Sequence, residues 1–234
     1  MEGVVSRDFW RGKRVLVTGH TGFKGGWLAL WLQSMGAKVT GFALAPETDP
    51  SLHDALNLSA LIDSRIGDIR NLDALADVFV ASQPEIVIHM AAQALVLRSY
   101  DDPLGTYGTN VMGTAHVLEC VRRSNSVRAV VIVTTDKCYA DQAWVWGYRE
   151  TDQLGGKDPY SSSKACTELL TQSFRSAFFS DLDKPLIASA RAGNVIGGGD
   201  WSDNRIVPDL VRAANKGESI ILRHPGAVRP WQFV

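Results

Sequence analysis

The segment KRVLVTGHTGFKG, residues 13–25, decides the fold of this chain. A short apolar run at Lys13–Val17 is followed at once by glycines at a spacing of three, Gly19, Gly22 and Gly25. Glycines after a strand allow a tight turn and a close approach of the backbone, and the helix that then begins directs its N–H groups at an anion. The pattern therefore predicts a strand, turn and helix that bind a dinucleotide pyrophosphate, with an ordinary strand–helix turn as the alternative.

The rest of the chain alternates strand and helix patterns. Continuous apolar runs are typical of strands covered on both faces, and they are expected at Lys38–Phe42, Arg65–Asp68, Ile86–His89, Arg128–Thr134 and Leu186–Ala192. Apolar residues at helical spacing predict helices at Phe23–Met35, Leu72–Ala81, Leu104–Arg123 and Ser161–Phe179. This alternation indicates an α/β fold, a doubly wound parallel sheet of the Rossmann type.

Composition excludes several other classes of protein. The 234 residues are 45% hydrophobic and 21% charged, with a net charge of -1, so the chain can fill a core and is neither disordered nor a disulfide-stapled module. The balanced charge argues against nucleic acid or a membrane surface as a partner, and no segment has the pattern of a signal peptide or membrane span. The three cysteines, Cys120, Cys138 and Cys166, fit neither a disulfide framework nor a metal site, and we expect reduced thiols in a cytoplasmic protein.

The pattern changes near Gly193. Residues 1–192 carry the alternation and are expected to form a dinucleotide-binding catalytic domain. The Gly- and Asp-rich stretch that follows is typical of a loop, and a helix at Ile206–Lys216 and a short strand at Ser219–Leu222 are expected after it. Residues 193–234 are therefore predicted to be part of a substrate-binding lobe.

The expected cofactor site extends beyond the glycine turn. The second strand ends in Gly41–Leu44 with neither an acidic nor a basic residue, so the choice between NAD and NADP stays open. Asp68 and Ile69, after the third strand, are expected to contact the adenine, although Asp68 could instead cap the helix that begins near Asn71. The residues expected to line the channel after the fourth strand are Ala91, Ala92 and Gln93.

Tyr160 and Lys164 form the candidate catalytic pair. They are four residues apart at the start of a predicted helix, so their side chains project from one face. A phenol has a pKa of about 10, and a nearby ammonium favours its phenolate form. The spacing predicts a proton acceptor and the group that tunes it, with a surface tyrosine and a solvated lysine as the alternative.

Together these motifs resemble the extended short-chain dehydrogenase/reductase family, and the resemblance covers the whole sequence. The motifs that carry it are GHTGFKG, MAAQA, Asn110 in GTNVMGT, TTDK, YSSSK and GNVIGGGDW. The resemblance implies a Rossmann-like fold and NAD as the cofactor, with NADP not excluded. It also implies cofactor contacts from Gly19, Thr21, Gly22, Phe23, Lys24, Gly25, Asn110, Tyr160 and Lys164.

Within the family, the segment at 134–137 resembles that of the sugar-nucleotide 4,6-dehydratases. Oxidation at C4 acidifies the C5 proton, and loss of the C6 hydroxyl then requires a base and an acid. The resemblance implies that Thr135 binds the 4-hydroxyl and that Asp136 is the acid. Lys137 stands where dTDP-glucose relatives have a glutamate base. It could act as a base if its pKa were lowered, or stabilise the enolate electrostatically, and the sequence leaves both open.

The resemblance implies CDP-glucose or a related sugar nucleotide as substrate, and a homodimer formed through the helices at 104–123 and 161–179. The alternatives are another sugar-nucleotide dehydratase or 4-epimerase of the same fold, or a cofactor-binding fragment without turnover. Family members usually continue well beyond the RPWQ segment at 229–232, so a further segment that completes the nucleotide pocket is expected. The resemblance implies substrate contacts from Ser99, Tyr100, Asn194, Gly199, Asp200 and Trp201, with a core role for Tyr100 and simple packing of Trp201 as the alternatives. Arg205 and Arg229 are candidate diphosphate partners, because a guanidinium fork matches phosphate geometry, with a surface ion pair as the alternative for each.

Overall fold

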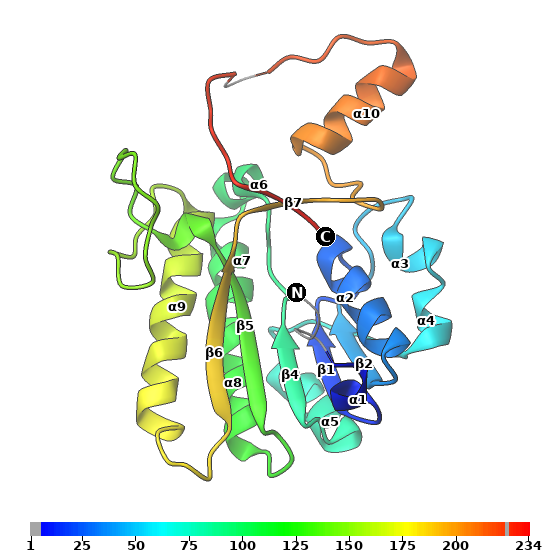
Figure 1. Cartoon of the computed structure of the whole chain (residues 1–234), viewed down its shortest axis with the longest axis vertical. Helices are drawn as coiled ribbons and strands as arrows, with labels where there is room; N and C mark the ends of the chain where they lie inside the picture. The colour runs from blue at the N-terminus through cyan, green and yellow to red at the C-terminus, as the bar shows by residue number, and fades with distance from the viewer. Residues whose placement is uncertain (1–5, 223–224) are drawn as a thin grey trace.

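The computed structural model describes residues 6–222 and 225–234, and its centre is a six-stranded parallel sheet (Figure 1). The strands are β1 (Arg14–Thr18), β2 (Lys38–Ala43), β3 (Asp63–Ile66), β4 (Ile86–His89), β5 (Ala129–Thr135) and β6 (Leu186–Ala192). Their order in the sheet is β3-β2-β1-β4-β5-β6. Successive strands are added on one side of β1 up to β3 and on its other side from β4 onward. At this switch between β1 and β4, doubly wound folds bind ligands at the carboxyl ends of the strands. The predicted fold class is confirmed.

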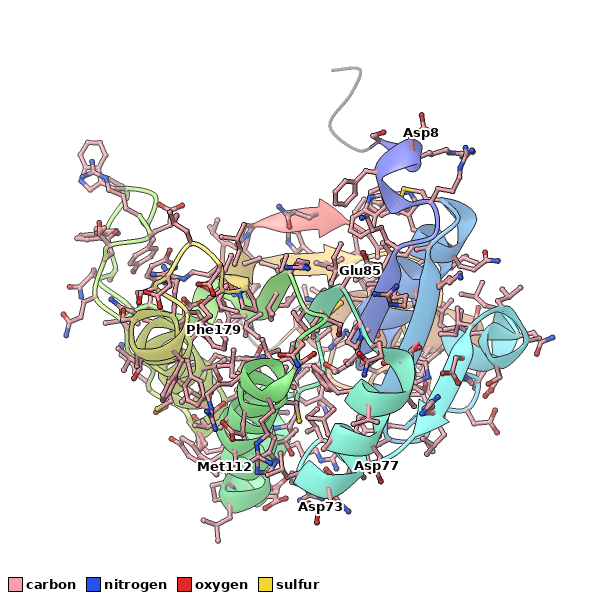
Figure 2. The ribbon with its side chains drawn as sticks, turned by 90° about the horizontal axis from the view of Figure 1, so that it is seen from below. Asp8, Asp73, Asp77, Glu85, Met112 and Phe179 are labelled. Carbon is pink, nitrogen blue, oxygen red and sulfur yellow. The ribbon has the colours of Figure 1, made fainter. Side chains whose placement is uncertain are left out.

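Alternate residues of β1 point into two hydrophobic cores. Leu16 packs with Val87 and Ile132 on one face, against α5 (Leu72–Ser82), α8 (Gly113–Arg123) and α9 (Pro159–Phe178). Val15 and Val17 pack on the other face, against α2 (Phe23–Ser34) and α4 (Leu58–Leu61). Figure 2 shows Asp73 and Asp77 on the outer side of α5. Burial on both faces explains why the strands have continuous apolar sequences.

Short elements connect these layers. They are α1 (Arg7–Trp10), α3 (Leu52–Ala55), α6 (Val96–Asp101), α7 (Pro103–Tyr107), a π-helical turn (Gly108–Met112) and a 3-10 turn (Asp136–Cys138). The helix predicted at Leu104–Arg123 therefore begins one residue earlier, at Pro103, and contains a π-helical turn before α8. Asp102 accepts a hydrogen bond from the backbone N–H of Gly105 (2.9 Å) and so fixes this start. The widened turn carries Asn110, and π-turns are frequent at functional sites.

Two predictions after Gly193 are wrong. The predicted loop contains a short strand, β7 (Asn194–Ile196), which pairs in parallel with β8 (Trp231–Phe233). The strand predicted at Ser219–Leu222 is irregular, because these residues have no neighbouring strand to pair with, and Ile221 is 87% exposed. A three-residue strand whose partner lies far along the chain leaves no periodic signal in the sequence.

The helix α10 (Ile206–Lys216) has the predicted bounds and stands above the main body in Figure 1. The last strand of the large sheet ends at Ala192, and the second sheet begins at Asn194. The predicted division after residue 192 falls between the two sheets and stays a prediction. In the described parts of the chain, no helix has the length and apolar character needed to cross a membrane.

Candidate active site

The glycine turn, residues 19–25, joins β1 to α2 and fits tightly against the neighbouring backbone. Gly19 has a φ of +81°, and a Cβ there would lie 2.7 Å from the backbone nitrogen of Ala91. A Cβ on Gly25 would lie 2.0 Å from the carbonyl oxygen of Gly19. Thr21 anchors the turn by donating a hydrogen bond to the carbonyl of Leu44 (2.9 Å). Only glycine fits at positions 19 and 25 without movement of the backbone.

The open side of this turn fits a dinucleotide pyrophosphate. A Cβ on Gly22 would meet only the carbonyl oxygen of Gly19, at 3.5 Å, so the space in front of Gly22 is free for a ligand. Gly22 is also the N-cap of α2, and no side chain caps that helix, whose first residues are Phe23 and Lys24. An uncapped helix N-terminus attracts an anion through its N–H groups and its dipole.

Asp68 lies just after β3 and binds its neighbour Arg70. The Arg70 guanidinium donates to the carboxylate through Nη2 (2.6 Å) and Nε (2.9 Å), and this contact lowers the pKa of Asp68. Asn71 is the residue that caps α5, by accepting from the N–H of Ala74 (3.1 Å). The alternative in which Asp68 caps this helix is therefore wrong. Ile69 is buried and contacts Gly113, so the segment is fixed at the edge of the sheet.

A buried hydrogen-bond chain fixes the loop after β4. The Thr18 hydroxyl accepts from the N–H groups of Met90 (3.1 Å) and Ala91 (3.2 Å), so it donates its own proton to Nδ1 of His89 (2.6 Å). Nε2 of His89 then donates to the hydroxyl of Thr114 (3.0 Å), which donates to a backbone carbonyl. This direction requires neutral His89. Burial, followed by the charge of Lys164, lowers the pKa of His89 to about 3.

Asn110 connects that loop to the catalytic helix. Its Oδ1 accepts from the N–H of Gln93 (2.9 Å), and its Nδ2 donates to the hydroxyl of Ser163 (2.8 Å). Ser163 in turn donates to the carbonyl of Tyr160 (2.7 Å). Asn110 is 1% exposed, and these bonds occupy both ends of its amide. The side chain thus lies between the channel residues Ala91–Gln93 and α9, and its predicted contact with the cofactor stays a prediction.

Tyr160 is held at the N-terminus of α9. Asp158 caps the helix by accepting from the N–H of Ser161 (2.9 Å), and Pro159 occupies the first helical position, where no N–H is needed. The N–H of Tyr160 donates to the hydroxyl of Ser99 (3.2 Å). Ser99 is fully buried beneath Tyr160, whereas the adjacent Tyr100 is 61% exposed. Ser99 and Tyr100, which are both predicted to bind substrate, therefore differ in exposure: the first is buried and the second is exposed.

Tyr160 and Lys164 lie on the sheet side of α9, both with less than a tenth of their surface exposed. Nζ of Lys164 donates to the carbonyl of Val133 in β5 (3.3 Å). The pKa of Lys164 is lowered to about 8, first by burial and then by the charge of Lys24, while Glu168 acts in the opposite direction. Burial raises the pKa of Tyr160, and a hydrogen bond with the Thr135 side chain acts in the opposite direction.

Thr135, Asp136 and Lys137 face the same tyrosine from the end of β5. The Thr135 hydroxyl donates to the carboxylate of Asp136 (2.9 Å) and shares a hydrogen bond with the Tyr160 side chain. Nζ of Lys137 is 5.9 Å from the centroid of the Tyr160 ring, a cation–π distance. The structure thus brings the five predicted catalytic residues, Thr135, Asp136, Lys137, Tyr160 and Lys164, together around the carboxyl end of β5.

The segment 197–201 lies over the cofactor end of the site. The carbonyl of Gly198 accepts from Nε1 of Trp27 on α2 (2.9 Å), and a Cβ on Gly199 would collide with Leu52 of α3. Asp200 and Arg205 form an ion pair at 2.9 Å in which the aspartate side chain is 5% exposed. The Trp27 hydrogen bond and the packing of Gly199 on Leu52 hold this segment against α2 and α3, and the Asp200–Arg205 pair braces the segment internally.

The predicted substrate residues separate into two groups. Arg205 lies near Lys24 and Tyr160, and its charge acts to lower the pKa of each of them. Arg229 is exposed and donates to the carbonyl of Val228 (2.9 Å), and Trp201 is 38% exposed. Asn194 lies in β7, where its N–H donates to the carbonyl of Pro230 (3.0 Å). The structure brings Arg205 to the site and leaves Arg229 at the surface.

Sequence reasoning missed Glu168 and Arg191, which form a buried ion pair behind Lys164 at 2.9 Å. Glu168 follows Lys164 by four residues, so the spacing places both on one face of α9. That spacing is the signal that could have identified the carboxylate. Arg191, its partner in β6, has no comparable local signal in the sequence.

The chain is similar in sequence to curated sugar-nucleotide dehydratases. This chain is 52% identical over 99% of its length to CDP-glucose 4,6-dehydratase of Salmonella typhimurium, and the match covers 66% of that protein. It is 28% identical over 94% of its length to dTDP-glucose 4,6-dehydratase of Xanthomonas campestris pv. campestris, covering 64% of that protein. The chain therefore spans about two thirds of the length of the curated relatives it matches.

Solved structures support the fold. UDP-glucose 4-epimerase from Thermotoga maritima, solved with UDP-glucose, matches with a TM-score of 0.82 at 24% identity, over 94% of this chain and 69% of that one. The dTDP-glucose 4,6-dehydratase from Bacillus anthracis, solved in complex with NAD, matches with a TM-score of 0.79 at 23% identity, over 95% of this chain and 68% of that one. At these identities the likeness concerns the fold.

The sequence also matches the NAD dependent epimerase/dehydratase family over residues 15–234. The family's cofactor is NAD, which answers the question that the second strand leaves open between NAD and NADP. The match includes the glycine turn, the tyrosine–lysine pair and the end of β5. With these elements in their expected positions around the sheet, the chain belongs to the NAD dependent epimerase/dehydratase family.

Proposed function

We propose that the protein is a sugar-nucleotide 4,6-dehydratase that converts CDP-glucose to CDP-4-keto-6-deoxyglucose and water. The observation that carries the proposal is the acid and amine pair Asp136–Lys137 beside Tyr160, with Nζ of Lys137 5.9 Å from the tyrosine ring. A 4-epimerase oxidises and reduces only C4 and needs no such pair, whereas a dehydration needs both groups. The 52% identity to the Salmonella CDP-glucose enzyme supports cytidine as the base.

Tyr160 begins the reaction at the sugar 4-hydroxyl. Its phenolic oxygen, hydrogen-bonded with Thr135, accepts the 4-hydroxyl proton, and the Lys164 ammonium stabilises the phenolate. NAD held at the glycine turn would supply the hydride chemistry at C4 and C6. Thr135 also binds the 4-oxygen, so that the hydroxyl proton points toward the phenolic oxygen of Tyr160.

Asp136 and Lys137 serve the elimination. Once C4 is a ketone, the C5–H bond and the C6–O bond break, and one water leaves. Asp136 donates a proton to the departing C6 hydroxyl. Lys137 acts at C5 in one of two ways. As a neutral amine it takes the C5 proton; as an ammonium it stabilises the enolate while another group takes that proton. The pH dependence of C5 proton exchange with solvent distinguishes these two roles.

The cofactor and substrate contacts are proposed from the site around these residues. The open face of the glycine turn and the uncapped N-terminus of α2 support a pyrophosphate site. The proposed NAD contacts are Gly19, Thr21, Gly22, Phe23, Lys24, Gly25, Asp68, Ile69, Ala91, Ala92, Gln93, Asn110, Tyr160 and Lys164. The proposed substrate contacts are Ser99, Tyr100, Asn194, Gly199, Asp200, Trp201, Arg205 and Arg229.

We further propose a cytoplasmic homodimer with two parts, residues 1–192 for cofactor and catalysis and residues 193–234 for sugar-nucleotide binding. Exposed apolar side chains on the 104–123 and 161–179 segments support the dimer: Leu104 is 84% exposed, Met112 53%, Leu169 54% and Phe178 47%. Free cysteines, with Cys120 and Cys138 buried, fit a reducing compartment.

The test is incubation of the whole protein with CDP-glucose and a small amount of NAD, followed by mass spectrometry of the sugar nucleotide. The proposal predicts loss of one water per sugar without accumulation of NADH, and slower turnover of dTDP-glucose and GDP-glucose. Formation of CDP-galactose would favour the epimerase alternative. NADH that accumulates in proportion to consumed substrate would contradict an internal redox cycle.

A further inference from the structure

Glu168 is a buried carboxylate to which the proposed reaction assigns no part. Its side chain is 5% exposed and is surrounded by donors. Nη2 of Arg191 donates to Oε2 at 2.9 Å, the Ser189 hydroxyl donates to the same oxygen at 2.8 Å, and the Thr134 hydroxyl donates to Oε1. These three donors stabilise the charged form of the carboxylate. If the carboxylate were lost, each donor would be left without its partner.

These contacts fasten α9 to the two strands that border the catalytic site. Thr134 directly precedes Thr135, the residue that shares a hydrogen bond with Tyr160. One turn earlier on the helix, Lys164 contacts the same strand through the carbonyl of Val133 (3.3 Å). Glu168 therefore makes the second of two attachments that fix the distance between the tyrosine on α9 and the threonine on β5.

The charge of Glu168 also acts on Lys164. Burial raises the pKa of Glu168, but the hydrogen bonds from Arg191, Thr134 and Ser189 outweigh burial and keep the pKa below its usual range. The carboxylate then raises the pKa of Lys164, against the effects of burial and of Lys24. The other titratable groups near Lys164 are Cys138 in the 3-10 turn and His89 in β4.

We propose that Glu168 is a positioning residue, which holds Tyr160 and Lys164 in register with Thr135 and places its negative charge one helical turn from Lys164. The inference rests on the proposed function, since Tyr160 and Lys164 are the groups that it serves. The Glu168 side chain is 5% exposed and is hydrogen-bonded to residues of β5 and β6.

The first variant is Glu168→Gln, which keeps the size and an acceptor oxygen but removes the charge. Its matched control is Glu119→Gln on α8, away from the site, where the carboxylate is likewise paired with arginine, in this case with both Arg122 and Arg123. Arg191→Gln removes the opposite charge. Thr134→Val breaks only the contact to β5, and Thr134→Ser restores the hydroxyl. These variants separate charge, contact and general stability.

The measurements are kcat and KM of the whole protein over a range of pH, and the titration of Lys164 followed by NMR of labelled lysine. Glu168→Gln is expected to lower kcat about tenfold, leave KM within about twofold, and move the alkaline limb of kcat and the Lys164 titration to lower pH by about one unit. Arg191→Gln should move the titration to higher pH. Thr134→Val should lower kcat with little change in titration, and Thr134→Ser should recover it.

A purely structural role would reduce folded protein in both charge variants without opposite shifts of the Lys164 titration, and that result would overturn the inference. So would a wild-type kcat in Glu168→Gln. If Glu168→Gln does not fold, two other results test the inference. They are the direction in which Arg191→Gln moves the Lys164 titration, and the difference in kcat between Thr134→Val and Thr134→Ser. If the wild type has no dehydratase activity while the titration shifts as described, the proposed function fails and the link from Glu168 to Lys164 stands.

Discussion

At the glycine turn, the backbone itself forms the site. A Cβ on Gly25 would lie 2.0 Å from the carbonyl oxygen of Gly19, and one on Gly22 would lie in open space. At the start of α9, by contrast, the site is made of buried polar side chains: Tyr160, Lys164 and Glu168 all have less than a tenth of their surface exposed. The turn depends on the absence of atoms, whereas α9 depends on the presence of particular charges and hydroxyls. The two regions should therefore respond to different kinds of substitution.

The largest effect is expected from Tyr160→Phe, which removes one oxygen from α9 and nothing from the turn. Because the phenolic oxygen of Tyr160 is the proposed acceptor of the 4-hydroxyl proton, kcat should fall about 1,000-fold. The dissociation constant for NAD, measured by fluorescence quenching, should change by less than about threefold. A parallel loss of NAD binding would mean that the two regions are not separable in the way described here.

Gly25→Ala attacks the other region and is expected to have the next largest effect. The added methyl group overlaps a backbone carbonyl that cannot move without displacing the turn, so the free energy of unfolding should fall by about 4 kcal/mol. Urea unfolding measures this directly.

The matched control is Gly22→Ala, whose methyl group enters the open side of the turn. It should change the free energy of unfolding by less than about 1 kcal/mol and weaken NAD binding at least tenfold, since it occupies the pyrophosphate space. Equal destabilisation by both alanines would refute the contrast between a packed and an open glycine.

The two regions also differ in how far the sequence predicts them. The turn is local: Gly19, Gly22 and Gly25 follow one strand, and their spacing predicts both the strand–helix unit and its ligand. The Tyr160–Lys164 pair is predicted for the same reason, since four residues of helix place both on one face. Ser99 beneath Tyr160, and Arg191 against Glu168, come from distant segments, and only the folded sheet brings them there.

The same reason explains the errors. The pairing of β7 with β8 joins Asn194 to Trp231, and neither segment has an alternating pattern long enough to read. The π-helical turn at Asn110 interrupts a helix whose periodicity looks continuous in the sequence.

A smaller effect is expected from two buried histidines, His20 in the glycine turn and His89 in β4. His20 is fully buried in the glycine turn, and among the residues that the structure describes its Nδ1 has no hydrogen-bond partner. Burial, with His53, lowers the pKa of His20 to about 4, and the pKa of His89 is about 3. Because the unfolded chain binds these protons at higher pH than the folded one, stability should be complete above about pH 7 and fall by about 2 kcal/mol for each of the two histidines by pH 5.

Replacement by leucine sharpens this comparison. At pH 7, His89→Leu should cost about 2 kcal/mol more free energy of unfolding than His20→Leu, because it removes both the acceptor for the Thr18 hydroxyl proton and the donor to the Thr114 hydroxyl. Each substitution should also reduce the loss of stability between pH 7 and pH 5. An unchanged pH dependence in both variants would mean that other groups cause the acid sensitivity.

The most direct test of the central claim uses CDP-glucose that carries deuterium at C4. A 4,6-dehydratase with the proposed arrangement of Tyr160, Asp136 and Lys137 moves that deuterium to C6 of the same sugar, with one proton from solvent at C5. We predict a 4-keto-6-deoxy product with deuterium in its methyl group, as seen by NMR and mass spectrometry. Deuterium returned to C4 of an epimerised sugar, or lost from the sugar without dehydration, would contradict the account.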